Sequence, residues 1–165
     1  MTESQVALLA ACIAAMVAVL SITLTILAGR SAETKSAYRR TIEPFLPLLS
    51  EAIHSTIATS IIIGKTKTEK ARQNWRNKAK SPKESLKQLC RKVKYPLWGL
   101  SDHLQVITRL PDWADHLSAA KVPFEEFDSS ARGYGTSIDR TIKDAYLLGR
   151  PPKKCDLDVL AKHKE

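Results

Sequence analysis

The chain has 165 residues, a length that suits one ordinary domain beside a membrane segment. It has a net charge of +9 and three cysteines. Cys12, Cys90 and Cys155 are far apart and lack metal-ligand spacing, which argues against a structural zinc site and suits a reducing compartment. The positive charge points to an anionic partner: lipid headgroups, nucleic acid or an acidic protein.

Residues 6–29 form an uncharged, apolar stretch of 24 residues. As an α-helix they would be about 36 Å long, and the hydrocarbon core of a bilayer is about 30 Å thick. The residues before this stretch contain no Lys or Arg, unlike the start of a signal peptide, so we expect an uncleaved anchor. Basic residues follow from Arg30 onward. The positive-inside rule therefore predicts a single-pass protein of the cell membrane with its amino terminus outside and its domain in the cytoplasm.

Small residues recur along this span at spacings of four and three. They are Ala7, Ala11, Ala14, Ala18, Ser21, Thr25 and Ala28, which we call the small-residue seam. Such a seam lets two helix backbones approach closely, and its 3.5-residue period implies a left-handed crossing. We therefore expect the seam to form a homo-oligomer interface. If several copies surrounded one axis, Ser21 and Thr25 would face its lumen, so a small pore is an alternative.

Residues 30–43 are polar and compatible with a continuation of the first helix as far as Pro44 and Pro47. Residues 45–63 form a second apolar stretch, whose apolar and polar side chains fall on different helical faces. This pattern, with Gly64 at its end, predicts an amphipathic helix that is either buried in the core of the domain or lies on the membrane. A second membrane span is the alternative.

Residues 65–94 contain twelve Lys or Arg and two acids, which accounts for the whole positive balance beyond the span. We expect eight positions here to bind an anion, with Trp75 available to stack on a nucleic-acid base. They are Lys65, Lys67, Lys70, Arg72, Trp75, Arg76, Lys78 and Lys80. A solvated helix face without a ligand is the alternative. Within the run, the sequence Ser81-Pro82-Lys83-Glu84 predicts the start of a helix.

An apolar stripe at spacings of four and three extends from Leu86 to Ile107 and predicts the core-facing side of a helical bundle. Pro96 and Gly99 predict a break in it near Tyr95. The sequence Leu110-Pro111-Asp112 then predicts the start of a shorter helix that reaches about residue 119.

A second long stripe covers residues 124–146. Gly133 and Gly135 inside it indicate close packing or a local break, because glycine is unfavourable in a helix by about 1 kcal/mol relative to alanine. Gly149 and the two prolines after it predict a firm helix end. No segment alternates like a strand. We thus expect an all-α protein with a transmembrane anchor at residues 1–29, a cytoplasmic bundle of four or five helices at residues 30–149 and a polar, loosely ordered tail at residues 150–165.

The chain lacks the motifs of metal sites, nucleotide loops and nucleophile elbows, so we expect no metal, no cofactor and no small-molecule substrate. One pair of residues suggests catalysis. Arg109 and His116, in RLPDWADH, have a spacing that resembles the Arg-x4–6-His motif of HEPN-type helical RNases. In that family, Arg and His of two subunits meet and cleave RNA without a metal. The sequence departs from the motif at Leu110, where a polar residue is usual, and at Pro111. The alternative is that Arg109 caps a helix end and His116 has no catalytic role.

The leading functional interpretation is non-enzymatic. We expect a membrane-anchored scaffold or regulatory accessory protein that self-associates through the seam and presents a basic surface to lipid or to an acidic protein. The alternatives are a membrane-tethered, HEPN-like nucleic-acid-binding effector and a small pore-forming effector.

Overall fold

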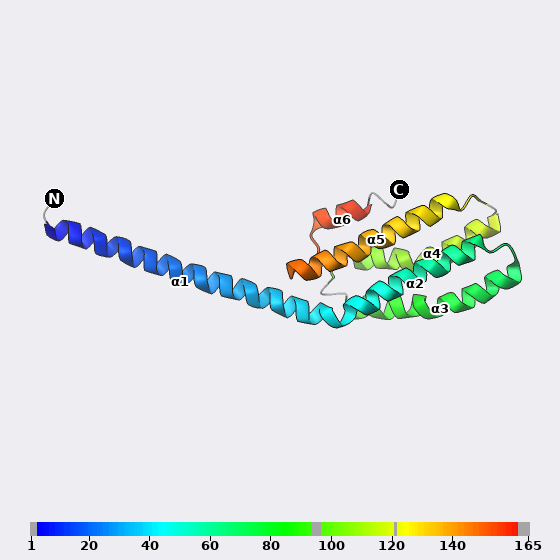
Figure 1. The fold of residues 1–165 in the computed structure, drawn as a ribbon, viewed down its shortest axis with the longest axis horizontal. Coiled ribbons are helices and arrows are strands. Elements are labelled where there is room, and N and C mark those ends of the chain that lie inside the picture. Colours follow the sequence, from blue (N-terminus) through cyan, green and yellow to red (C-terminus); the bar gives the residue numbers. More distant parts are fainter. Residues whose placement is uncertain (1–2, 94–96, 121, 162–165) are drawn as a thin grey trace. The chain divides into compact units, whose positions relative to one another are not determined.

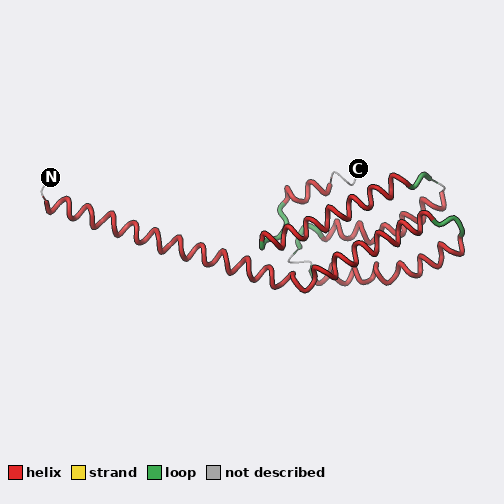
Figure 2. The backbone as a smooth tube through the Cα atoms, viewed as in Figure 1, coloured by secondary structure: helices red, strands yellow, loops and turns green. Residues whose placement is uncertain are grey.

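The structure is a computed structural model that describes residues 3–93, 97–120 and 122–161, with side chains described from residue 16 to residue 160. Figure 2 shows only helices and their connections in this part of the chain. The elements are α1 (Glu3–Ile42), the short 3-10 helix η1 (Glu43–Phe45), α2 (Leu46–Lys65), α3 (Glu69–Lys92), α4 (Ser101–Ala120), α5 (Glu125–Leu148) and α6 (Lys154–Ala161), as labelled in Figure 1. The predicted all-α class is confirmed.

The chain divides into two compact units, Met1–Ala37 and Tyr38–Glu165. The first unit is the greater part of α1, which continues through the polar residues after the apolar stretch, as predicted. α1 ends at Ile42, just before Pro44, because proline lacks the N–H that continues the helical hydrogen bonds. The boundary between the units therefore falls later in the chain than residue 29, where the predicted anchor ends.

The second unit is a helical bundle in which α2, α3, α4 and α5 lie side by side with alternating direction (Figure 1). α2 contacts the three other long helices and occupies the centre, as the predicted amphipathic helix buried in a core. Its buried hydroxyls are satisfied within the helix, since Thr56 and Ser60 each donate to the carbonyl four residues earlier at 2.7 Å. A polar residue therefore lies in the core without an unpaired donor.

The two predicted apolar stripes supply most of the core. From the first stripe, Leu86, Leu100 and Ile107 are fully buried, and from the second, Ile138 is. The predicted break near Tyr95 lies outside the described residues, with α3 ending at Lys92 and α4 beginning at Ser101 on either side.

Close packing explains one of the two glycines inside α5, Gly135. A Cβ added there would lie 2.0 Å from Cδ1 of Ile57, so the glycine allows α5 to pack closely on α2. A Cβ at Gly133 would have no neighbour within 4 Å, so packing does not account for that glycine. α5 continues through both positions without a break. Gly149 ends it in the left-handed conformation with φ 64°, as predicted.

Two predicted helix starts are wrong. Pro82 lies inside α3 and Pro111 lies inside α4, and both helices continue through them. A proline within a helix costs about 3 kcal/mol because one hydrogen bond is lost and the ring crowds the preceding turn. Core contacts on both sides offset that cost: Ala79 and Leu86 are buried on either side of Pro82.

The expectation of a loosely ordered tail is also wrong for part of residues 150–165. Lys154–Ala161 forms α6, whose Leu160 is fully buried and whose Leu157 packs against the main core. Asp156 fixes the first turn, accepting a hydrogen bond from the backbone N–H of Lys153 at 2.8 Å. The tail is polar in composition, but two apolar residues spaced for one helical face are enough to dock it.

The beginning of the bundle is held to the end of α5 by Arg39. Its guanidinium donates from Nε to the carbonyl of Tyr146 at 3.1 Å and from a terminal nitrogen to the carbonyl of Leu147 at 2.5 Å. These carbonyls belong to the last turn of α5, where the carbonyl of Tyr146 also accepts from the backbone N–H of Gly149 at 3.0 Å. Burial raises the pKa of neighbouring Tyr38 to about 12, so this phenol stays protonated at physiological pH.

Candidate functional site

The apolar part of α1 is exposed along its whole described length. Every residue from 16 to 35 is exposed, and the large side chains include Val19 at 63% and Leu24 at 65%. In the described part of the chain, one helical stretch near the amino terminus, Met16–Lys65, is long and apolar enough by length and composition to cross a membrane; it includes both the exposed apolar part of α1 and α2, which the bundle largely buries. An unburied apolar surface of this kind differs from that of a core helix, whose apolar side chains are covered by the rest of the chain.

The small-residue seam is described in part. The side chains of Ala7, Ala11 and Ala14 lie outside the described residues, whereas Ala18, Ser21, Thr25 and Ala28 are exposed on α1. Ser21 and Thr25 donate to carbonyls four residues earlier, at 2.9 Å and 2.8 Å. Both hydroxyl groups therefore donate their hydrogen bonds within α1, so neither is a free donor on the surface of the seam.

The basic run includes the whole of α3, and several of its predicted anion-binding residues already have acidic partners. Lys65 lies 2.5 Å from a carboxylate oxygen of Asp128 on α5. Arg76 lies 2.6 Å from Asp115 on α4, and Arg72 pairs with Glu69. The acids that neutralise the run are supplied largely by other helices.

These ion pairs shift the pKa values of the residues that form them. Hydrogen bonds from Lys65 and then Arg132 hold the pKa of Asp128 below its usual range. A hydrogen bond to Asp115 raises the pKa of the Arg76 guanidinium further, which is charged in any case. At neutral pH the end of α2 is thus tied to α5 by Lys65, and the start of α3 is tied to α4 by Arg76.

The remaining predicted positions divide into two kinds. Lys67, Lys70 and Lys80 are exposed and have no ion pair within the described part of the chain. Trp75 is half-buried against a small cluster of Ile63, Ala79 and Ala114, and the Nζ of Lys78 lies 4.3 Å from the centre of its ring. The core and Lys78 therefore occupy part of the surface that we expected to stack on a base.

Arg109 and His116 both lie on α4, which continues between them through Pro111. Seven residues correspond to about 10.5 Å along a helix and bring both to nearly the same face. Both side chains are exposed, and Arg109 is in mid-helix, so it does not cap a helix end. The alternative that Arg109 is a cap is therefore wrong, while RNase activity stays a prediction.

A groove of about 510 Å³ between α3 and α4 gathers cations that the predicted set of anion-binding residues did not include. Its basic lining residues are Lys83, Lys87, Arg91 and Arg109. The first three are spaced by four residues, a signal in the sequence that places them on one helical face. Sequence alone could not place Arg109 beside them, because that requires the pairing of α3 with α4.

A neighbouring groove of about 350 Å³ between the same helices is electrostatically more balanced. It includes the paired residues Arg76 and Asp115, as well as Lys83, which lies 2.6 Å from Asp112. His116 lines this groove, whereas Arg109 lines the larger one.

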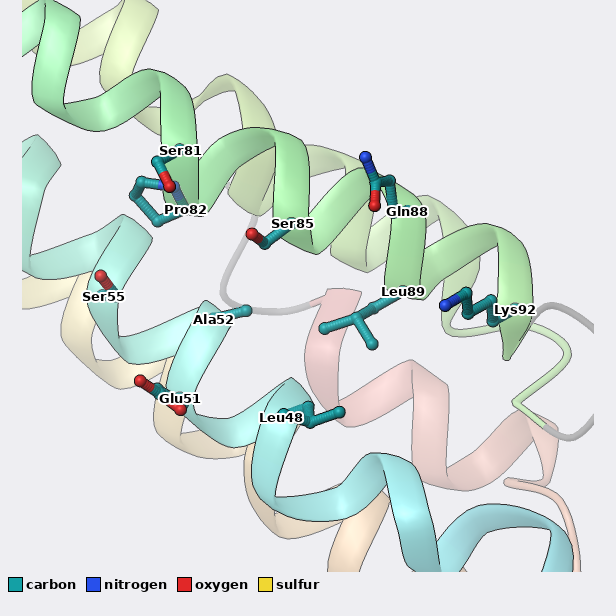
Figure 3. A pocket seen from close by; sticks show the side chains of 10 residues that line it. All are labelled: Leu48, Glu51, Ala52, Ser55, Ser81, Pro82, Ser85, Gln88, Leu89 and Lys92. Atoms are coloured by element: carbon teal, nitrogen blue, oxygen red, sulfur yellow. The ribbon is translucent and has the colours of Figure 1, made fainter.

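A third groove, of about 390 Å³, lies between α2 and α3 (Figure 3). Its polar lining is mainly hydroxyl and amide, from Ser55 on α2 and from Ser81, Ser85 and Gln88 on α3. Leu89 extends from α3 toward α2 at its base. Its lining also includes Glu51 and Lys92, neither of which forms an ion pair in the described part of the chain, so it has the character of a polar groove between packed helices.

No group of three or more His, Cys, Asp or Glu suited to a metal ion occurs in the described ranges. Cys90 and Cys155 are free thiols. His103 and Tyr134 share a buried hydrogen bond of 2.7 Å in the core, and burial raises the pKa of this tyrosine. Comparison with protein-family models, with curated proteins and with solved structures finds no match to this chain.

Proposed function

We propose that this protein is a membrane-anchored helical scaffold or regulatory accessory protein. The observation that carries the proposal is the exposed apolar surface of α1, where every described residue of the apolar stretch, from Met16 to Gly29, is exposed. Water disfavours such a surface at about 25 cal/mol per Å², and a bilayer removes it from water. The bundle that follows has its own closed core, as expected of a domain that an anchor holds in place.

We place the bundle in the cytoplasm. Support comes from the basic residues that follow the apolar stretch and from the free thiols of Cys90 and Cys155, which suit a reducing compartment. Cys155 is exposed and serves as a natural reporter of topology.

The anchoring test is extraction of membranes with alkaline carbonate, followed by labelling of intact cells with a membrane-impermeant maleimide. The protein should stay in the pellet, and Cys155 should react only after the cells are permeabilised. Release into the supernatant would contradict the anchor, and labelling of Cys155 in intact cells would contradict the orientation.

Self-association through the small-residue seam is the second part of the proposal. Close approach of two helices at small residues is the main source of packing energy between membrane helices. The chain offers a matched pair of threonines for the test. Thr25 lies on the seam, and Thr23 lies on nearly the opposite face; both are exposed and donate to a carbonyl four residues earlier.

Thr25→Leu should reduce the oligomer size of the full chain in mild detergent, since the larger side chain separates the backbones. Thr23→Leu should leave the size unchanged. Particle mass by light scattering provides the measurement. Equal behaviour of the two variants would contradict the seam as the interface and leave the anchoring test unaffected.

A further inference from the structure

The larger groove between α3 and α4 has an excess of positive charge in its lining. Lys83, Lys87, Arg91 and Arg109 contribute four positive charges, and Asp112 contributes one negative charge, so the lining is +3. Asp112 lies 2.6 Å from Lys83 at one end. The other three cations, Lys87, Arg91 and Arg109, form no ion pair with an acid that lines the groove.

These three cations are also weakly neutralised from outside the groove. Lys87 lies 3.9 Å from Glu84, and both side chains are about half exposed, so solvent weakens this pair. Arg91 and Arg109 have no ion pair in the ranges that the structure describes. Like charges around one groove repel each other, and an anion between them would lower that energy.

The uncharged lining of the groove suits an oxyanion. Ser101 and Gln105 from α4 add a hydroxyl and an amide group, whereas the hydroxyl of Thr108 donates to the carbonyl of Gln105 at 2.7 Å. Cys90 also lines the groove; burial raises its pKa to about 11, so at neutral pH its thiol adds no negative charge. The volume of about 510 Å³ falls within the range of small-molecule sites.

We propose that this groove binds a phosphate group that carries two or more negative charges, presented by a soluble phosphorylated small molecule or by a phospholipid headgroup. Two arginines and two lysines provide the chemistry, because the planar guanidinium can donate two parallel hydrogen bonds to phosphate oxygens and the ammonium adds point charge. The site belongs to the bundle alone and goes beyond the anchoring and self-association proposed above.

The test uses the full chain in nanodiscs of phosphatidylcholine, titrated with inorganic pyrophosphate by calorimetry at low ionic strength. Binding should be saturable and should weaken as salt is added. Arg109→Ala and Arg91→Ala should each weaken it about tenfold, the size expected for a hydrogen bond between charged groups. Both residues are exposed and both variants keep a good helix former, so circular dichroism should be unchanged.

The matched control is Lys154→Ala, since Lys154 is an exposed cation at the start of α6 and outside the groove. It should weaken binding less than about twofold, through the net charge alone. Absence of saturable binding to pyrophosphate and to phosphatidic acid would overturn the proposal. So would a loss in Lys154→Ala as large as that in Arg109→Ala.

Nanodiscs that contain phosphatidic acid distinguish the two sources of phosphate. If a lipid headgroup occupies the groove, phosphatidic acid in the disc should compete with pyrophosphate, and Arg109→Ala should remove its binding. If a soluble molecule is the ligand, pyrophosphate should bind equally well with or without phosphatidic acid. Either result supports a phosphate site, and failure of both leaves the anchoring test to be judged separately.

Discussion

The two halves of α3 are similarly basic in sequence but differ in what surrounds them. In the first half, Arg72 and Arg76 pair with Glu69 and Asp115. In the second half, Lys87 and Arg91 share a groove with another cation, Arg109. α4 places Asp115 against the first half and Asp112 against Lys83 at the start of the second half, but beside Lys87 and Arg91 it places an arginine, Arg109. A basic run therefore does not by itself locate an anion site, because the charges that remain uncompensated depend on the fold.

The largest effect is expected where the two halves of α3 meet. Leu86 is fully buried there, and Leu86→Ala should lower the free energy of unfolding by about 3 kcal/mol through lost burial and a new cavity. Both halves should unfold together in urea, observed by circular dichroism. The exposed neighbour Ser85 provides the control, since Ser85→Ala should change stability by less than about 0.5 kcal/mol. Two separate transitions would contradict a single continuous α3.

The next largest effect is expected in the first half of α3, where Arg76 pairs with Asp115. Asp115→Ala should cost about 1–2 kcal/mol of unfolding free energy, because Arg76 loses its nearest carboxylate at a partly buried position. Asp144 offers a matched aspartate, since it lies 3.9 Å from Arg140 and both are well exposed. Asp144→Ala should cost less than about 0.5 kcal/mol. Equal costs in urea denaturation would show that ion pairs do not hold the first half in place.

The pH dependence of stability should report the pair between Lys65 and Asp128. The pKa of Asp128 is lowered in the folded chain, so its contribution is present above the usual carboxyl pKa of about 4 and is lost as pH falls through its folded value. At pH 7, Asp128→Asn should be less stable than the wild type by about 0.5–1 kcal/mol. The two proteins should converge as pH falls below the lowered pKa of Asp128 in the folded chain. A constant difference at all pH values would contradict this assignment.

The smallest effect is expected at the arginine of α4 that faces the second half of α3. Arg109→Ala should change the free energy of unfolding by less than about 0.5 kcal/mol, and at low ionic strength the sign should be stabilising because repulsion is removed. Added salt should abolish the difference by screening. A clear loss of stability in thermal unfolding would show that Arg109 has a structural partner and would weaken the contrast between the halves.

Periodicity identified the core of this fold well. The stripes that include Leu86 and Ile138 were predicted from spacing alone, because burial of one helical face is a local property of the sequence. Local signals misplaced the helix starts at Pro82 and Pro111, since core contacts on both sides of each proline outweigh its cost. They also missed α6, whose stability depends on docking against the bundle rather than on its own propensity.

The candidate site was less predictable for the same reason. The run that contains Lys70 and Arg76 was identified by composition, but which cations are neutralised depends on carboxylates that are distant in sequence, such as Asp115 and Asp128. Arg109 was singled out for its spacing from His116, and the structure places it instead beside Lys87 in the groove. Both the neutralisation of these cations and the position of Arg109 depend on which helices pack together, and no local sequence pattern encodes that packing.

The contrast between the two halves of α3 is tested most directly by nuclear magnetic resonance of the arginine Nε–H groups in the full chain during a titration with pyrophosphate. The signals of Arg91 and Arg109 should shift and saturate, while those of Arg72 and Arg76, held by their carboxylates, should stay in place. Equal shifts in all four signals, or no shift in Arg91 and Arg109, would contradict it.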